Sequence, residues 1–238
     1  MKRLLLRLFP ALLLLTWLGA GAAAQVAGGR GQEIITRGNE RYARGEYKAA
    51  IAEYERVTRA DGEAYAQALY NIGVCRFELW QTEEAARAYR RAVEARGGRY
   101  PKASYALGVA LEELKQVSEA KETYEHAAAA GYAPALYKLG MLAARAGDDA
   151  RAAEHFRAAI SRAEGKFPAS HNNLGVMLAR AGRLAEAERE FAAAVSKSDV
   201  PFEEAANNLK LCRKLLAGQS KDGAAALKVA TAADGFNR

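Results

Sequence analysis

The sequence predicts an all-α protein, an α-solenoid of five helical hairpins followed by a C-terminal capping helix. Three observations predict this fold: glycines recur every 32 to 35 residues, an alanine follows each glycine by twelve residues, and an aromatic residue follows that alanine by four. Five copies that agree in three columns indicate a repeat architecture. The glycines are Gly38, Gly73, Gly108, Gly140 and Gly175; the alanines are Ala50, Ala85, Ala120, Ala152 and Ala187; the aromatics are Tyr54, Tyr89, Tyr124, Phe156 and Phe191.

Each repeat is interpreted as two helices. The glycine lies inside the first helix, where a close crossing leaves no room for a side chain. The alanine and the aromatic are an i, i+4 pair, so they share one face of the second helix. The expected repeats run over residues 31–64, 66–98, 101–131, 133–166 and 168–199.

The amino terminus has the pattern of a secretory signal peptide over residues 1–24. A basic start (Lys2, Arg3, Arg7) precedes a short apolar run and a small-residue end, which predicts cleavage between Ala24 and Gln25. The apolar run is shorter than the roughly 20 residues of a transmembrane helix. An uncleaved anchor is the alternative. Residues 25–31 are expected to be a flexible leader, and no later segment is apolar enough to span a membrane.

The carboxyl end departs from the hairpin pattern. Residues 201–217 predict one amphipathic helix without a partner, as expected for the cap of a solenoid that begins near residue 32. The sequence Asn-Asn-Leu at 172–174 recurs at 207–209, exactly one 35-residue period later. Residues 218–238 are rich in alanine, glycine and charge, which predicts a mostly disordered tail with a short helix near 224–232.

Composition narrows the classes of function. The formal charge is +7, and because three of the positive residues lie in the predicted signal peptide, the remainder carries about +4. This surplus is too small to predict nucleic-acid binding. Cys75 and Cys212 lie four repeats apart in the predicted solenoid, too far for a disulfide. We interpret them as small buried hydrophobic residues.

No pattern of catalytic or cofactor-binding residues emerges. His126, His155 and His171 lie in different predicted helices without metal-ligand spacing, which predicts no metal site. The sequence contains no phosphate-binding glycine loop. We therefore expect neither a catalytic residue nor a cofactor, and predict that the protein is not an enzyme.

The repeat resembles the tetratricopeptide repeat family, whose unit is a helical hairpin of about 34 residues. The resemblance rests on segments such as Leu174-Gly175, Gly182-Arg183-Leu184, Ala187 and Phe191, and it covers roughly residues 32–217. The fourth repeat is similar to the related Sel-like repeats. The proline that often closes a family repeat and the aromatic three residues after the glycine are both missing.

The resemblance implies that the first helix of each hairpin lines a concave face that binds a protein or peptide. Three tyrosines that stand three residues before their glycines would form a ladder there, unless they pack between adjacent helices. Charge along this face changes from acidic to basic toward the carboxyl end. The candidate residues of this face are Tyr70, Phe77, Tyr105, Tyr137, Met141, Arg145, Asn172, Arg180 and Asn207.

A partial carboxylate-clamp pattern is also implied by the resemblance. Asn39, Asn71 and Lys102 occupy three places that clamp-bearing members use to hold a peptide's terminal carboxylate, while two further places hold Ile35 and Ala106. Whether these residues bind anything is left open.

These observations predict a non-catalytic scaffold that is exported, to the periplasm or outside the cell, and holds an unidentified protein or peptide ligand in its groove. Two alternatives remain: a self-associating structural module, such as a homodimer, or an accessory bound to membrane or cell wall through its basic carboxyl end.

Overall fold

The computed structural model describes residues 29–219 and 223–230. The predicted signal peptide, its cleavage site and the first residues of the predicted leader lie outside these ranges. Within them every regular element is helical, which confirms the predicted all-α solenoid of hairpins. None of the described helices is long and apolar enough to cross a membrane.

The chain folds into two compact units, unit 1 (Met1–Gln116) and unit 2 (Val117–Arg238), where the sequence predicts one continuous array. The boundary falls between the two helices of the third predicted repeat. Each unit is described by itself.

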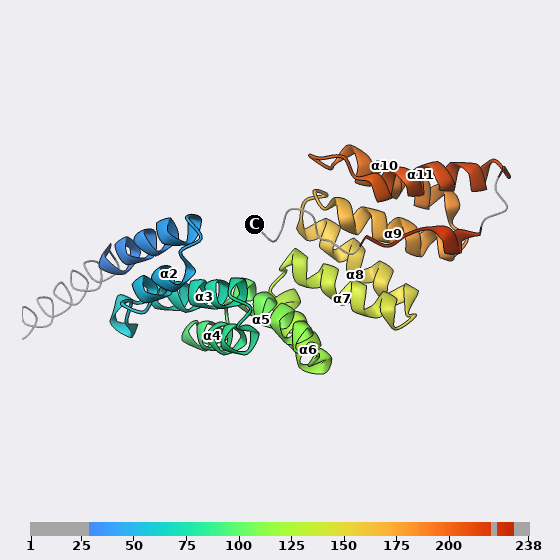
Figure 1. The fold of residues 1–238 in the computed structure, drawn as a ribbon. Coiled ribbons are helices and arrows are strands. Elements are labelled where there is room, and N and C mark those ends of the chain that lie inside the picture. Colours follow the sequence, from blue (N-terminus) through green and yellow to red (C-terminus); the bar gives the residue numbers. More distant parts are fainter. Residues whose placement is uncertain (1–28, 220–222, 231–238) are drawn as a thin grey trace, which may run out of the picture. The chain divides into compact units, whose positions relative to one another are not determined.

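Unit 1 begins, in its described part, with a helix at residues 29–43. The elements that follow are α2 (Tyr47–Tyr54), the 3₁₀ helix η1 (Arg59–Asp61), α3 (Glu63–Glu78), α4 (Thr82–Ala95) and α5 (Pro101–Glu113) (Figure 1). The helix at 29–43 packs on η1 and the start of α3, because Asp61 of η1 lies beside both Arg30 and Gly31 and Ala64 of α3 lies beside Gly31.

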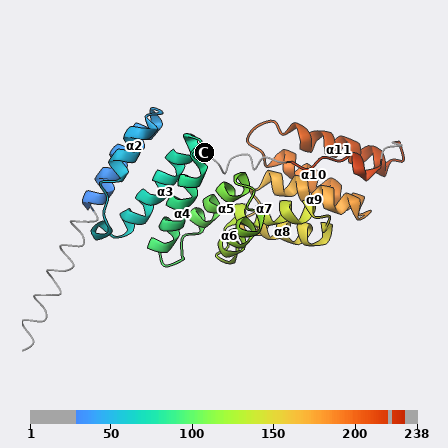
Figure 2. The same cartoon turned by 60° about the horizontal axis from the view of Figure 1, so that its bottom comes forward.

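Unit 2 contains α6 (Val117–Ala129), α7 (Ala133–Arg145), α8 (Asp149–Arg162), α9 (Pro168–Arg180), α10 (Leu184–Ser196), α11 (Glu203–Leu216) and the 3₁₀ turn η2 (Ala224–Ala226). Successive helices pack as antiparallel neighbours (Figure 2). A proline is the first residue of α5 and α9 and the second residue of α7, where the missing N–H costs no helical hydrogen bond.

The repeat glycines sit directly under the repeat aromatics. A Cβ added at Gly175 would lie 2.7 Å from Cε1 of Phe191, and one at Gly140 would lie 2.6 Å from Cε1 of Phe156. Gly38 and Gly73 stand in the same relation to Tyr54 and Tyr89 in unit 1. The repeat alanines are fully buried in both units. Glycine and alanine therefore let paired helices approach closely enough for one ring to fill the space between them.

The carboxyl-terminal segment differs from its prediction. Residues 224–226 form a single 3₁₀ turn, and residues 227–230, which start with an extended backbone at Leu227, form no helix. Leu227 and Ala230 are 3% and 4% exposed, so this stretch is packed against unit 2. It is the red segment that runs along α9 and α11 in Figures 1 and 2.

Candidate functional site

Three asparagines and one tyrosine form a buried polar cluster in unit 2, which we call the asparagine site: Tyr137, Asn172, Asn173 and Asn208. Tyr137 lies on α7, Asn172 and Asn173 lie on α9, and Asn208 lies on α11. These are the first helices of two successive hairpins and the capping helix. Each of the four side chains is at most 3% exposed, although asparagine is seldom fully buried.

The cluster is buried because residues 227–230 lie on it. Asn208 accepts a hydrogen bond from the backbone N–H of Lys228 at 3.0 Å and donates to the carbonyl of Lys228 at 2.7 Å. Asn173 does the same one step along, accepting from the N–H of Ala230 at 2.7 Å and donating to its carbonyl at 3.0 Å. Each amide thus pairs with both polar groups of one backbone residue.

We call the side-chain amides of Asn173 and Asn208, each of which holds both polar groups of one residue, the backbone clamps. Their spacing matches an extended strand. Asn173 and Asn208 are 35 residues apart and occupy equivalent positions in successive repeats, while the residues they bind are two apart. In an extended chain the N–H and C=O of residues i and i+2 point to the same side. A step of one repeat along the protein therefore corresponds to a step of two residues along the bound segment.

A second layer of hydrogen bonds fixes the orientation of the clamps. Asn208 Nδ2 donates to Asn172 Oδ1 at 2.8 Å, and Asn172 Nδ2 donates to Asn173 Oδ1 at 3.1 Å and to the Lys228 carbonyl at 3.2 Å. The Tyr137 hydroxyl donates to the carbonyl of Ala230 at 2.8 Å and accepts from Asn173 at 3.3 Å. An amide carries both donor and acceptor atoms, so asparagine is suited to such a chain.

Three predicted candidates lie in or beside this site. Tyr137 and Asn172 are part of it, and Met141 borders it, with its sulfur 3.1 Å from Asn173 Nδ2. Asn207, in contrast, is exposed, and its neighbour Asn208 is the residue that points inward. The sequence reasoning missed Asn173 and Asn208, although the recurrence of Asn-Asn-Leu one period apart was the signal that could have identified them.

The predicted tyrosine ladder is largely packed inside the units. Tyr70 is half-buried, with ring centroids 5.6 Å from Tyr89 and 5.7 Å from Tyr100. Tyr105 is 5% exposed. The Tyr137 ring packs against Phe167 at 5.2 Å, and only its hydroxyl takes part in the asparagine site. The alternative of packed rings therefore describes these tyrosines better.

Two residues of the partial carboxylate-clamp pattern, Asn39 and Asn71, lie together in unit 1. Asn71 Nδ2 donates to Asn39 Oδ1 at 3.2 Å, and the same oxygen accepts the Tyr54 hydroxyl at 2.7 Å. Lys102 lies apart from this pair, with Nζ 4.9 Å from the ring centroid of Tyr70. The oxygen of Asn39 is thus used by the chain's own side chains.

The remaining candidates lie outside the asparagine site, although Arg145 and Arg180 are at the ends of its helices α7 and α9. Phe77 is half-buried on α3, and Arg145 is exposed at the end of α7. Arg180 pairs with Asp149 at 3.2 Å.

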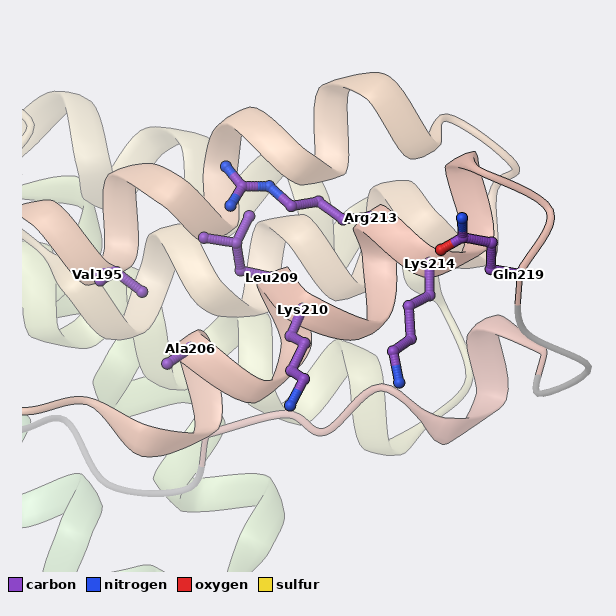
Figure 3. A pocket seen from close by; sticks show the side chains of 7 residues that line it. All are labelled: Val195, Ala206, Leu209, Lys210, Arg213, Lys214 and Gln219. Carbon is purple, nitrogen blue, oxygen red and sulfur yellow. The ribbon is translucent and has the colours of Figure 1, made fainter.

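A basic pocket of about 360 Å³ is lined by residues of α10 and α11 and by Gln219 (Figure 3). Val195, Ala206 and Leu209 supply its apolar wall. Arg213 points toward α10, where Nε donates to Glu188 at 2.8 Å, whereas Lys210 and Lys214 point to the opposite side of the helix. Among the described residues, no cluster of three or more histidine, cysteine, aspartate or glutamate side chains could hold a metal ion.

Comparison with known proteins defines the class of the molecule. Helical hairpins in which a glycine of the first helix packs under an aromatic ring of the second are the features of a helical-repeat protein. The sequence matches the tetratricopeptide repeat family over residues 35–98, 81–134, 105–170 and 137–201. The chain belongs to this family, whose members are typically non-catalytic scaffolds for protein–protein interaction.

Solved structures agree on the fold. Pseudomonas aeruginosa PilF is similar with a TM-score of 0.67 and 16% identity, covering 82% of this chain and 86% of its own. PilW, a type IV pilus biogenesis factor, gives 0.61 and 18%, covering 80% and 87%. YrrB, described as a repeat protein with an unusual peptide-binding site, gives 0.52 and 22%, covering 79% and 91%. No curated protein sequence matches the chain.

Proposed function

We propose that the protein is an exported, non-catalytic scaffold that binds an extended segment of a partner protein at the asparagine site. The observation that carries the proposal is the double clamp by which Asn173 and Asn208 hold the backbone of residues 228 and 230. Hydrogen bonds to the backbone do not depend on the side chains of the bound segment, so the site can hold extended peptides of many sequences. A protein-binding scaffold needs this chemistry.

The hydrogen bonds that hold the side chains of the site in place also support binding. The four side chains are linked to one another by hydrogen bonds, so their amides stay aligned for a ligand at little further cost in entropy. The site lies on first helices, the face to which family resemblance assigns the ligand.

The proposed export rests on residues 1–24, with their basic start, apolar run and small-residue end. Envelope function is consistent with the similarity to PilW, a pilus biogenesis factor, and the periplasm is the compartment we propose. Protein recovered from its native cells should begin at Gln25. A mature amino terminus at Met1 would contradict export by a cleaved signal.

The binding proposal is tested by selecting ligands from a displayed library of random eight-residue peptides. The wild-type chain, an Asn173→Ala, Asn208→Ala double variant and an Asn207→Ala control are used as targets. We expect the clones enriched by the wild type to bind the control equally and the double variant at least about ten-fold less.

Asn207 is the matched control because it is the exposed neighbour of Asn208 on the same helix. Circular dichroism and thermal unfolding establish that all three chains remain helical. Equal enrichment by the double variant and the wild type would contradict peptide binding at the asparagine site.

A further inference from the structure

We infer that the chain's own carboxyl-terminal segment is a tethered competitor that occupies the asparagine site, and that its sequence shows which peptides the site accepts. The inference rests on the proposed function. The ligand class it names is an extended peptide with an aliphatic side chain three positions before a small one, as Leu227 precedes Ala230.

The side chains of the segment divide into two that are buried and two that are not. Leu227 joins the main buried cluster of unit 2, and Ala230 joins a second cluster with Ala194, Phe202 and Ala205. Lys228 is exposed and Val229 is half-buried. Val229 packs against the same cluster as Leu227, so the site selects most strongly at the first and fourth positions and tolerates variation at the second, Lys228.

The fourth position is restricted in size. The carbonyl of Ala230 is held by both Tyr137 and Asn173, and its methyl group faces the ring of Phe202 and two further alanines in a 4% exposed setting. A larger side chain has no space there unless the backbone leaves its clamps. Glycine, alanine or serine are the residues that fit.

The segment is tied closely to the site that it occupies. Only six residues of the chain, 217–222, separate the end of α11 from Gly223. A short tether gives an effective concentration in the millimolar range. A free peptide with the same contacts must compete with this concentration, so the observed affinity of the intact chain is lower than that of the open site.

The occupant is nevertheless replaceable. Its contacts are backbone hydrogen bonds and the apolar side chains of Leu227, Val229 and Ala230, and Lys228 is exposed. When the segment leaves, the links Asn208–Asn172–Asn173 persist within the site. The same amides then face the next strand without rearrangement, so a partner segment can take over the clamps.

The test compares full-length chains that differ only in the segment. Leu227→Asp places a charge in the apolar pocket of the segment and should release it, while the helical hairpins keep all their residues. Lys228→Ala is the matched control, because this side chain is exposed. The probe is a fluorescent synthetic peptide with the sequence of residues 223–230, measured by anisotropy.

We expect the Leu227→Asp chain to bind the probe about ten-fold more tightly than the wild type and the Lys228→Ala control. Adding Asn208→Ala to Leu227→Asp should abolish that gain. A probe carrying Phe in place of Ala230 should bind the released chain at least ten-fold more weakly, whereas one carrying Ala in place of Lys228 should bind as before.

The possible failures are distinguishable. Equal binding of the probe by the wild type and Leu227→Asp, dependent on Asn208, overturns the competitor and leaves peptide binding intact. No Asn208-dependent binding to either chain overturns the competitor and the proposed site together. A wild-type dimer that Leu227→Asp converts to monomer in sedimentation would place the segment on a second copy and overturn the tethered arrangement.

Discussion

Asn71 in unit 1 and Asn173 in unit 2 stand in the same column of the repeat, two residues before a helix glycine, yet they do different things. Asn71 is half-buried and donates to Asn39, whose oxygen also accepts the Tyr54 hydroxyl. Asn173 is fully buried and holds both polar groups of Ala230. The repeat supplies the same amide in both units, and the groups that cover it decide whether it bonds a neighbouring side chain or a peptide backbone.

In the core of each unit an aromatic ring packs on a glycine of the neighbouring helix. Removing such a ring has the largest expected effect on the free energy of unfolding. Phe191 is fully buried against Gly175, and Phe191→Ala should lower the free energy of unfolding by about 3 to 5 kcal/mol, because a ring-sized cavity remains. Chemical denaturation measures the change. Val200→Ala, at a 59% exposed position, should change it by less than about 0.5 kcal/mol. Equal effects would contradict the assigned packing.

The comparison of the two asparagines is tested directly by removing each amide. Asn173→Ala should cost about 1 to 3 kcal/mol, because it leaves buried partners without hydrogen bonds, and should increase amide hydrogen exchange at residues 227–230. Asn71→Ala should cost less than about 0.5 kcal/mol, because water replaces its partner. Similar costs for the two variants would show that the column is structural in both units.

Asp61 holds the start of unit 1 through its charge. It accepts hydrogen bonds from the Thr58 N–H at 2.7 Å and the Thr58 hydroxyl at 2.9 Å, and Arg30 lies 3.3 Å away. Burial opposes the charged form, but the hydrogen bonds of Thr58 and the charge of Arg30 together hold the pKa of Asp61 below its ordinary value. Asp61→Asn should cost about 1 kcal/mol at neutral pH, because hydrogen bonds to a charged group contribute about that much more than hydrogen bonds to a neutral one.

The sign of its pH dependence follows from the lowered pKa. The stabilisation is present above the unfolded pKa of about 3.9 and is lost as the pH falls through the folded pKa. The difference in unfolding free energy between wild type and Asp61→Asn should therefore be constant above pH 5 and shrink in acid. A difference that grew on acidification would contradict this assignment.

The turns between paired helices give the smallest predicted effect. Gly147 and Gly182 have positive φ in unit 2, but the equivalent residue of the second repeat is Trp80, with φ of 60° and 91% exposure. Because a side chain is disfavoured in this conformation, Trp80→Gly should raise the stability of unit 1 by about 0.5 to 1 kcal/mol. Lys115→Gly, at φ of 62°, should do the same. A loss of stability in Trp80→Gly would reveal a packing role for the indole.

The sequence predicted the hairpins well because local and nearest-neighbour packing determine them. A glycine opposite an aromatic, with a small residue one turn away, allows only a close helix crossing, and the pattern is visible in every copy. The same reasoning assigned the wrong asparagine of the pair at 207 and 208. Both lie on one helix turn, and only the packing of α11 against α9 determines which of them faces inward.

By itself, the sequence determined the period, the helical hairpins and the residues between paired helices, because these interactions repeat at fixed separations along the chain. Only the tertiary structure decided that residues 227–230 lie on the asparagine site, and that the chain forms two compact units. Segments 57 residues apart in the chain meet there through backbone hydrogen bonds. Backbone groups are the same in every residue, so no pattern of side chains in the sequence predicts where an extended segment will bind.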